Sequence, residues 1–187
     1  MFRSMILGLA LVAGMSTAAH AQTAWVVDPA SSQVGFEYLK DGAPTEGVFR
    51  EFSGAGTFDS SAPEAARFQI SIASASIDLF DSLASAFATS AEWFDSKNNP
   101  NVVYVLQDLK PLGGDRYAAS GTIQIRGVEK PMTSEIALKI GSSDANASGT
   151  LTIRRADFLL GVGPSAAFVE VGPDVQVTFA LIARQGG

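Results

Sequence analysis

From residue 33 onward, short runs of the sequence alternate apolar and polar side chains, and this period of two constrains the fold more than any other feature. Successive side chains of a β-strand point to opposite faces of the sheet, so the alternation predicts strands that are buried on one face. Most of the chain lacks the three-and-four spacing of an amphipathic helix. We therefore predict an all-β fold. The positions that share a face in the clearest runs are Val34, Phe36 and Tyr38; Phe68, Ile70 and Ile72; Tyr117, Ala119, Gly121, Ile123 and Ile125; Met132, Ser134, Ile136, Leu138 and Ile140; Gly149, Leu151 and Ile153; and Val175, Val177, Phe179 and Leu181.

Turn-forming residues separate these runs, at residues 40–44, 60–63, 113–115 and 141–144. Glycine, proline, aspartate and serine are typical of tight connections, and Gly113-Gly114 predicts a hairpin. Gly54 and Gly56 lie inside a strand-like stretch and predict a bulge or a sharply coiled sheet. A single domain of about eight antiparallel strands fits a sandwich or a barrel, and the pattern alone leaves both open.

The segment 81–94 breaks the alternation. It is rich in alanine, Asp81 or Ser82 is suited to cap a helix, and Leu83 and Phe87 would share one helical face. We predict a short helix of one or two turns there, over the mouth of the barrel if the sheet closes into one. Pro100 ends this segment, and the next strand is predicted at residues 102–106.

The N-terminus has the three parts of an export signal. Arg3 is followed by an apolar run at residues 5–13 and by small and polar residues that end in Ala19-His20-Ala21, an A-x-A cleavage site. The apolar run is shorter than the roughly 20 residues that a membrane-spanning helix needs. We predict a cleaved signal peptide at residues 1–21 and a single exported domain at residues 22–187.

Composition excludes several classes of function. The net charge is −6 and no basic cluster occurs, so nucleic acid is not expected as a partner. The chain has no cysteine, and its one histidine, His20, leaves with the signal, so we predict no metal site, no catalytic residue and no enzyme activity. Residues 161–166 match G-x-G-x-x-A but contain Pro164 and are read as a loop. Asp78 and Asp81 are interpreted as turn and helix-cap acids.

Phenylalanine is abundant, with 12 in the chain, and much of it lies on the predicted inner faces. Small residues, Gly35, Gly47, Gly54 and Gly121, alternate with these aromatics and would leave room for an elongated apolar ligand. A barrel of about eight strands is of a size at which the interior can be either packed with side chains or hollow enough for a ligand, so this pattern leaves both possibilities open. If the barrel encloses a cavity, the residues predicted to line it and to bind the ligand are Phe36, Tyr38, Phe49, Phe68, Ile70, Phe87, Tyr104, Ile123, Ile125, Ile136 and Phe179.

Six motifs, in order over most of the chain, resemble those of the YceI-like family. They are Trp25-Val26-Val27-Asp28-Pro29 with residues 32–36; the G-x-F-x-x-F-x-G-like residues 47–54; Ala75-Ser76-Ile77-Asp78; residues 90–95 with Pro100; residues 121–128 with Lys130-Pro131; and residues 153–158. The resemblance implies a lipocalin-like antiparallel barrel, a periplasmic location and a long isoprenoid or other amphiphile in the interior. Four positions depart from the family pattern: Ser31 replaces a histidine, Leu79-Phe80 replaces threonine-glycine and Leu159 replaces a glycine.

The leading hypothesis is a non-catalytic periplasmic protein that binds a polyisoprenoid or an isoprenoid quinone as its ligand and needs no other cofactor. Arg155 and Asp157 are expected to serve the fold as a partly buried polar pair. Transient contact with inner-membrane components and a homodimer stay open. Two alternatives also stay open: a stress-response or interaction protein with a packed barrel, and an accessory to membrane electron transfer that handles quinones.

Overall fold

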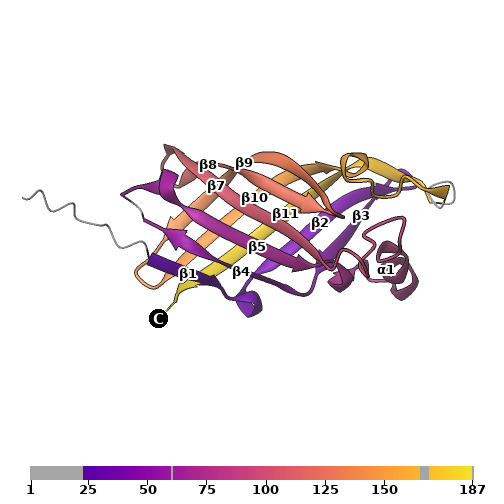
Figure 1. Ribbon diagram of the computed structural model, residues 1–187, viewed down its shortest axis with the longest axis horizontal. Helices are drawn as coiled ribbons and strands as arrows, with labels where there is room; N and C mark the ends of the chain where they lie inside the picture. The colour runs from indigo at the N-terminus through magenta and orange to yellow at the C-terminus, as the bar shows by residue number, and fades with distance from the viewer. Residues whose placement is uncertain (1–22, 60, 165–168, 187) are drawn as a thin grey trace, which may run out of the picture.

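The computed structural model describes residues 23–59, 61–164 and 169–186, so the predicted signal peptide lies outside the described residues. The fold is almost entirely β-structure, as the alternation predicts (Figure 1). One α-helix, α1 (Ser82–Ala88), and short 3-10 helices, among them η4 (Arg155–Phe158), connect the strands. The strands are β1 (Thr23–Val27), β2 (Gln33–Lys40), β3 (Ala43–Phe49), β4 (Phe52–Phe58), β5 (Arg67–Ala73), β6 (Ile77–Asp78), β7 (Asn101–Gly113), β8 (Arg116–Ile125), β9 (Val128–Ile140), β10 (Asp144–Arg154) and β11 (Val171–Gln185).

The strands close into a barrel rather than packing as a sandwich. Eight of them form an antiparallel ring in the order β1-β4-β5-β7-β8-β9-β10-β11, and β1 pairs again with β11 to close it. The long strand β11 bonds β1 through its last residues and β2 through its earlier residues, so β2, β3 and β6 continue the wall beyond β1 and β4. The predicted barrel of about eight antiparallel strands is therefore confirmed.

Glycines allow neighbouring strands to turn tightly and to approach closely. Gly113 and Gly114 have φ angles of 104° and 59° in the β7–β8 hairpin, a conformation that glycine adopts at little cost. A Cβ atom on Gly56 would lie 2.1 Å from the carbonyl oxygen of Arg67, and one on Gly121 would lie 2.0 Å from that of Val105. The register of β4 with β5 is unbroken from Phe52 to Thr57, so the bulge that these glycines could indicate does not occur there; Gly56 and Gly121 instead let paired backbones approach closely.

The helix α1 lies at one end of the barrel, and the free ends of β1 and β11 lie at the other (Figure 1). The Asp81 carboxylate caps α1 by accepting a hydrogen bond of 2.7 Å from the backbone N–H of Ala84. The helix ends at Ala88 and residues 89–100 form turns, so α1 has the predicted one or two turns but fills only half of the segment 81–94. Strand β7 begins after Pro100 as predicted and extends to Gly113, far beyond the expected Leu106.

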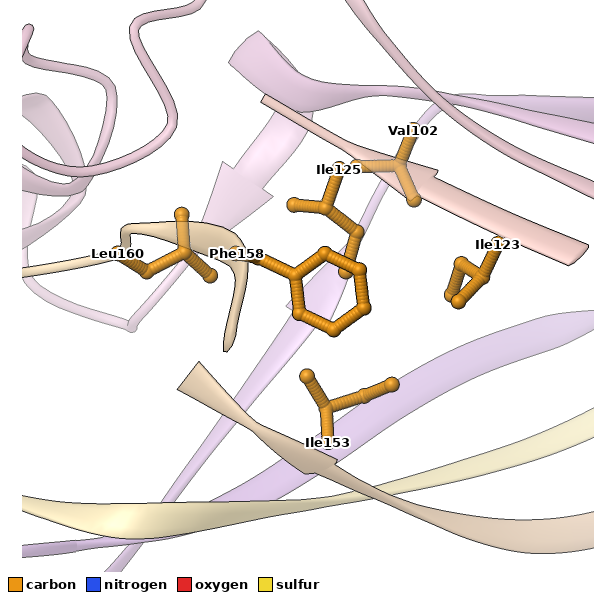
Figure 2. Packing of buried hydrophobic residues seen from close by; sticks show 6 residues of the cluster. All are labelled: Val102, Ile123, Ile125, Ile153, Phe158 and Leu160. Carbon is orange, nitrogen blue, oxygen red and sulfur yellow. The ribbon is translucent and has the colours of Figure 1, made fainter. Parts of the chain in front are cut away.

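The barrel wall opens between β9 and β10 toward the α1 end. These strands pair only between Ile136–Ile140 and Ala145–Gly149, while the rest of β9 pairs with β8 and the rest of β10 with β11. The chain after β10 turns inward at η4 and inserts Phe158, which is 2% exposed. Figure 2 shows the Phe158 ring between Ile125 and Ile153, so an aromatic side chain fills the interior beside this opening.

Among the described residues, no helix is both long and apolar enough to cross a membrane.

Candidate ligand-binding cavity

A cavity of about 800 Å³ occupies the barrel interior. Every strand of the barrel contributes to its wall, together with α1 and the turns that follow it. The lining is overwhelmingly apolar, and the volume lies in the range of about 300–1,000 Å³ that is common for ligand sites. The inward faces of the alternating strands therefore enclose space instead of filling it.

All eleven of the positions predicted from the sequence line this cavity. They are Phe36, Tyr38, Phe49, Phe68, Ile70, Phe87, Tyr104, Ile123, Ile125, Ile136 and Phe179. They come from seven strands and from α1, and residues as far apart in the sequence as Phe36 and Phe179 line the same cavity. Their contact with a lipid stays a prediction.

The wall also includes residues that the sequence reasoning missed. Trp25 and Val27 of β1 and Leu79 and Leu83 next to and within α1 belong to it. Trp25 and Val27 do alternate with exposed Ala24 and Val26, but β1 has only five residues, too few for a clear period. The alternation that marks the inner face of β1 is therefore present in the sequence, but it is weak.

The expectation that glycines make room for a ligand is wrong. None of Gly35, Gly47, Gly54 and Gly121 lines the cavity. A Cβ atom on Gly47 would lie 2.4 Å from the ring of Phe36, and one on Gly54 would lie 2.5 Å from Cδ1 of Ile70. At Gly47, Gly54 and Gly121, neighbouring parts of the wall already occupy the space that the missing side chain leaves, so these three glycines serve packing of the wall itself.

Aromatic rings gather on the wall at the α1 end. The rings of Phe36 and Phe49 lie 5.4 Å apart, and Phe94 approaches Phe49 edge-on at 5.8 Å. Tyr38 continues the row at 6.1 Å from Phe36. Centroid distances of 4.5–7 Å are typical of favourable aromatic pairs, so these side chains form a rigid apolar surface.

Charged groups on the wall are confined to the α1 end. They are Lys40 at the end of β2, Asp81 at the start of α1 and Arg155 in η4. Deeper in the barrel, the lining residues that carry a polar side-chain atom include Thr57, Ser134, Tyr104 and Trp25, all of them uncharged. The deep part of the cavity thus offers uncharged groups only.

Three buried donors near the cavity have no hydrogen-bond partner among the described residues. They are Oη of Tyr104, Nε1 of Trp25 and Nε1 of Trp93. Burial raises the pKa of the Tyr104 phenol, and that of Tyr38, above the ordinary value of 10.0. The Tyr104 hydroxyl is therefore a neutral donor throughout the physiological range.

Arg155 ties the chain after η4 to the start of β11. Its Nη1 donates to the carbonyl oxygens of Leu160 and Gly161 at 2.9 and 3.0 Å, and Nη2 and Nε donate to those of Val171 and Gly172 at 3.0 Å each. The guanidinium is thus occupied by the protein's own backbone. It organises the α1 end and has little capacity left for a ligand.

The expected pairing of Arg155 with Asp157 is wrong. Asp157 is exposed, and no ion pair within the described ranges includes it. Arg126 supplies the second tie at this end by donating to the carbonyl oxygens of Ala91 and Leu159. Backbone carbonyl oxygens, rather than a carboxylate, accept the hydrogen bonds of both arginines.

Other candidate residues have structural roles. Asp78 binds Arg50 at 2.8 Å, and this hydrogen-bonded ion pair lowers the pKa of its carboxyl. Gly161 packs on Trp93 with a φ of 62°, in a loop as expected, although residues 165 and 166 of the G-x-G-x-x-A match lie outside the described residues. Within the described ranges, no three His, Cys, Asp or Glu side chains lie close enough to hold a metal ion.

The chain is similar in sequence and in fold to known proteins. The model of the YceI-like domain matches residues 25–183, which is most of the chain. This chain belongs to the YceI-like family. A UPF0312 protein of Pseudomonas putida is 27% identical over 94% of both chains, and one of Pectobacterium carotovorum is 28% identical over 67% of this chain and 69% of its own length.

Two solved structures share the shape of this barrel. BcnA of Burkholderia cenocepacia is 30% identical, covers 83% of this chain and 98% of its own, and has a TM-score of 0.77. A polyisoprenoid binding domain from Saccharophagus degradans, implicated in plant cell wall breakdown, is 17% identical, covers 88% and 99% of the two chains and has a TM-score of 0.73. At that identity the second likeness concerns the fold.

The departures from the YceI-like pattern fall at the α1 end or on the surface. Phe80 and Leu159 both have a φ of 58°, in the left-handed region that favours glycine, so glycine in the family pattern would suit the backbone at both positions. Leu79 lines the cavity. Ser31 is exposed in η1 and donates from Oγ to Asp28 at 2.9 Å, away from the cavity.

Proposed function

We propose that this protein is a non-catalytic periplasmic carrier or reservoir that encloses a long isoprenoid lipid, either a polyisoprenoid or an isoprenoid quinone. The apolar cavity of about 800 Å³ carries this proposal. A cavity of this size also disfavours the alternative of a stress-response or interaction protein with a packed barrel. The polyisoprenoid binding domain of Saccharophagus degradans has the same fold, which supports this class of ligand.

Burial of the hydrocarbon supplies the binding free energy. Each buried CH₂ contributes roughly 0.8 kcal/mol, so about ten methylenes reach roughly 8 kcal/mol before ordering costs. A ligand of this kind needs no ionic anchor, in keeping with a deep wall whose polar groups are uncharged. Among the described residues that line the deep part of the cavity, no acid–base pair occurs, in keeping with a protein that stores its ligand unchanged.

The test is native mass spectrometry of protein purified from the periplasm. We expect a mass that corresponds to residues 22–187, after cleavage behind Ala21, plus a bound lipid that organic extraction releases and identifies. A lipid-free mass, together with no uptake of added prenols or quinones, would overturn the proposal. Recovery of the protein only from the cytoplasm would overturn its location.

A pair of variants links uptake to the cavity. Ala147 lines the interior, whereas the next residue, Ser148, is exposed on the outside of β10. In Ala147→Trp the indole would displace at least two methylenes of a lipid, which corresponds to roughly tenfold weaker uptake. Ser148→Trp adds the same side chain outside and should leave uptake unchanged. Equal uptake by both variants would mean that the lipid binds elsewhere.

A further inference from the structure

Large apolar side chains are exposed to solvent at the α1 end of the barrel. They belong to Leu39, Phe80, Leu83, Leu159 and Val162. The exposed fraction is 79% for Leu83 within α1 and 64% for Phe80 just before it. Single exposed apolar residues are ordinary, but a group of them at one end of a domain marks an interaction surface.

These side chains surround the α1 end of the cavity. They lie on three segments, the β2–β3 hairpin, the region of α1 and the connection between β10 and β11, which meet at one end of the barrel (Figure 1). Backbone hydrogen bonds join the segments, since Gly161 donates to Glu92 at 2.8 Å and Asp41 to Glu170 at 2.9 Å. Each segment also lines the cavity, through Lys40, Leu83 and Leu160 in turn. The exposed apolar surface is therefore continuous with the apolar interior.

Two of the three segments contain long stretches without charge. Residues 82–91 and residues 158–164 include no Asp, Glu, Lys or Arg, although 17% of the chain is charged. A charged side chain is costly to place in lipid, whereas an apolar one gains free energy there. These stretches can thus enter the boundary between headgroups and acyl chains without burying a charge.

The cations at this end offer little attraction for an anionic surface. The arginines are occupied by carboxylates or by backbone carbonyl oxygens: Arg50 by Asp78, Arg154 by Asp174, and Arg126 and Arg155 by carbonyls. The lysines Lys40, Lys97 and Lys130 each stand within two residues of an aspartate or a glutamate. Binding to anionic lipids needs clustered Lys and Arg, so the surface fits a partner without net charge.

We propose that the α1 end docks on a lipid bilayer of zwitterionic headgroups, with Phe80, Leu83 and Val162 inserted at its surface. The inference rests on the proposed lipid-binding function, because an isoprenoid that avoids water must pass directly between a bilayer and the cavity. Insertion is shallow, since the guanidinium of Arg50 lies 5.8 Å from the Phe80 ring centre and its ion pair with Asp78 stays at headgroup level.

Cosedimentation with vesicles of phosphatidylethanolamine and phosphatidylcholine tests the docking. We expect the natural protein to pellet with them, to pellet no better when phosphatidylglycerol replaces phosphatidylcholine, and to stay bound in high salt. Replacing both Phe80→Ser and Val162→Ser should weaken partitioning roughly tenfold or more, because two side chains no longer leave water. Leu112→Ser with Val26→Ser is the matched control, since both residues are about half exposed away from the α1 end, and it should bind like the natural protein.

Three results would contradict the docking: equal binding by the two double variants, binding only to phosphatidylglycerol vesicles with loss in salt, or no vesicle binding at all. In the last case, a dimer that Phe80→Ser with Val162→Ser converts to a monomer in size-exclusion chromatography would assign the surface to a second copy of the chain.

Uptake without a bilayer separates this inference from the proposed function. Phe80 and Val162 do not line the cavity, so their double variant should take up geranylgeraniol from a cyclodextrin complex as the natural protein does, but more slowly from vesicles. If the natural protein takes up this prenol from cyclodextrin yet does not bind vesicles, the docking fails while the proposed function stands. If it takes up no prenol from either source, the proposed function fails and the docking loses its basis.

Discussion

Gly121 lies where the backbone of β7 passes unusually close to β8. A Cβ atom at this position would lie 2.0 Å from the carbonyl oxygen of Val105, while Cβ atoms in proteins essentially never come within 3.0 Å of such an atom. The obstacle is backbone, so no side-chain rotation can relieve it, and the paired strands must separate. We expect Gly121→Ala to lower the free energy of unfolding by about 3 kcal/mol, the upper part of the usual range for overpacking.

Urea denaturation measures this change. With an m-value of about 2 kcal/mol per M, a loss of about 3 kcal/mol lowers the midpoint by about 1.5 M. Gly35→Ala is the matched control, because its Cβ would meet its nearest atom, the carbonyl oxygen of Gly47, at an ordinary 3.6 Å. Its midpoint should stay the same or rise slightly, since alanine restricts the unfolded chain. Equal midpoints for the two variants would refute the assignment of a tight β7–β8 approach.

Three further predictions concern the α1 end and the deep wall. Leu159→Gly should raise the free energy of unfolding by about 0.5–1 kcal/mol in the same urea assay, because Leu159 is half exposed and its φ of 58° suits glycine; a loss of stability would contradict this. Phe158→Ala should lower it by about 3–5 kcal/mol, since the ring is 2% exposed between Ile125 and Ile153, and a loss below 1 kcal/mol would mean that the ring is not packed as described. Burial raises the pKa of the Tyr104 phenol, so as the pH rises through 10 the unfolded chain loses the phenol proton before the folded protein does, and the free energy of unfolding falls. Tyr104→Phe should make this fall with pH less steep in denaturation curves measured at successive pH values. An equally steep fall in the variant would argue against a buried phenol.

Much of the fold follows from local sequence. Alternation in β8, from Tyr117 to Ile125, and in β11, from Val175 to Leu181, identifies strands and their inner faces because side-chain direction has a fixed period. Hairpin chemistry at Gly113-Gly114 and the cap at Asp81 are equally local. These features were predicted correctly because each depends on residues that are close together in the chain.

Hydrogen bonds between distant loops could not be predicted from local sequence. Arg155 looked like the partner of a nearby carboxylate, but its guanidinium bonds carbonyls on both sides of the segment that leads to β11. Arg126 binds carbonyls more than 30 residues away in both directions along the chain. Backbone carbonyls occur at every residue, so no sequence pattern marks which of them an arginine will reach.

The hollow interior is the clearest case of a property that the chain defines only in three dimensions. The sequence suggested that glycines opposite aromatics would leave the space, yet Phe36 fills the place beside Gly47 and the β7 backbone fills that beside Gly121. The wall of the cavity instead includes alanines such as Ala119 and Ala147, whose side chains end far short of the barrel axis. Alternation fixes which side chains face inward, but the distance between opposite walls depends on how eight strands coil and close. Tight glycine contacts within the wall and open space across the barrel are therefore two results of the same curvature.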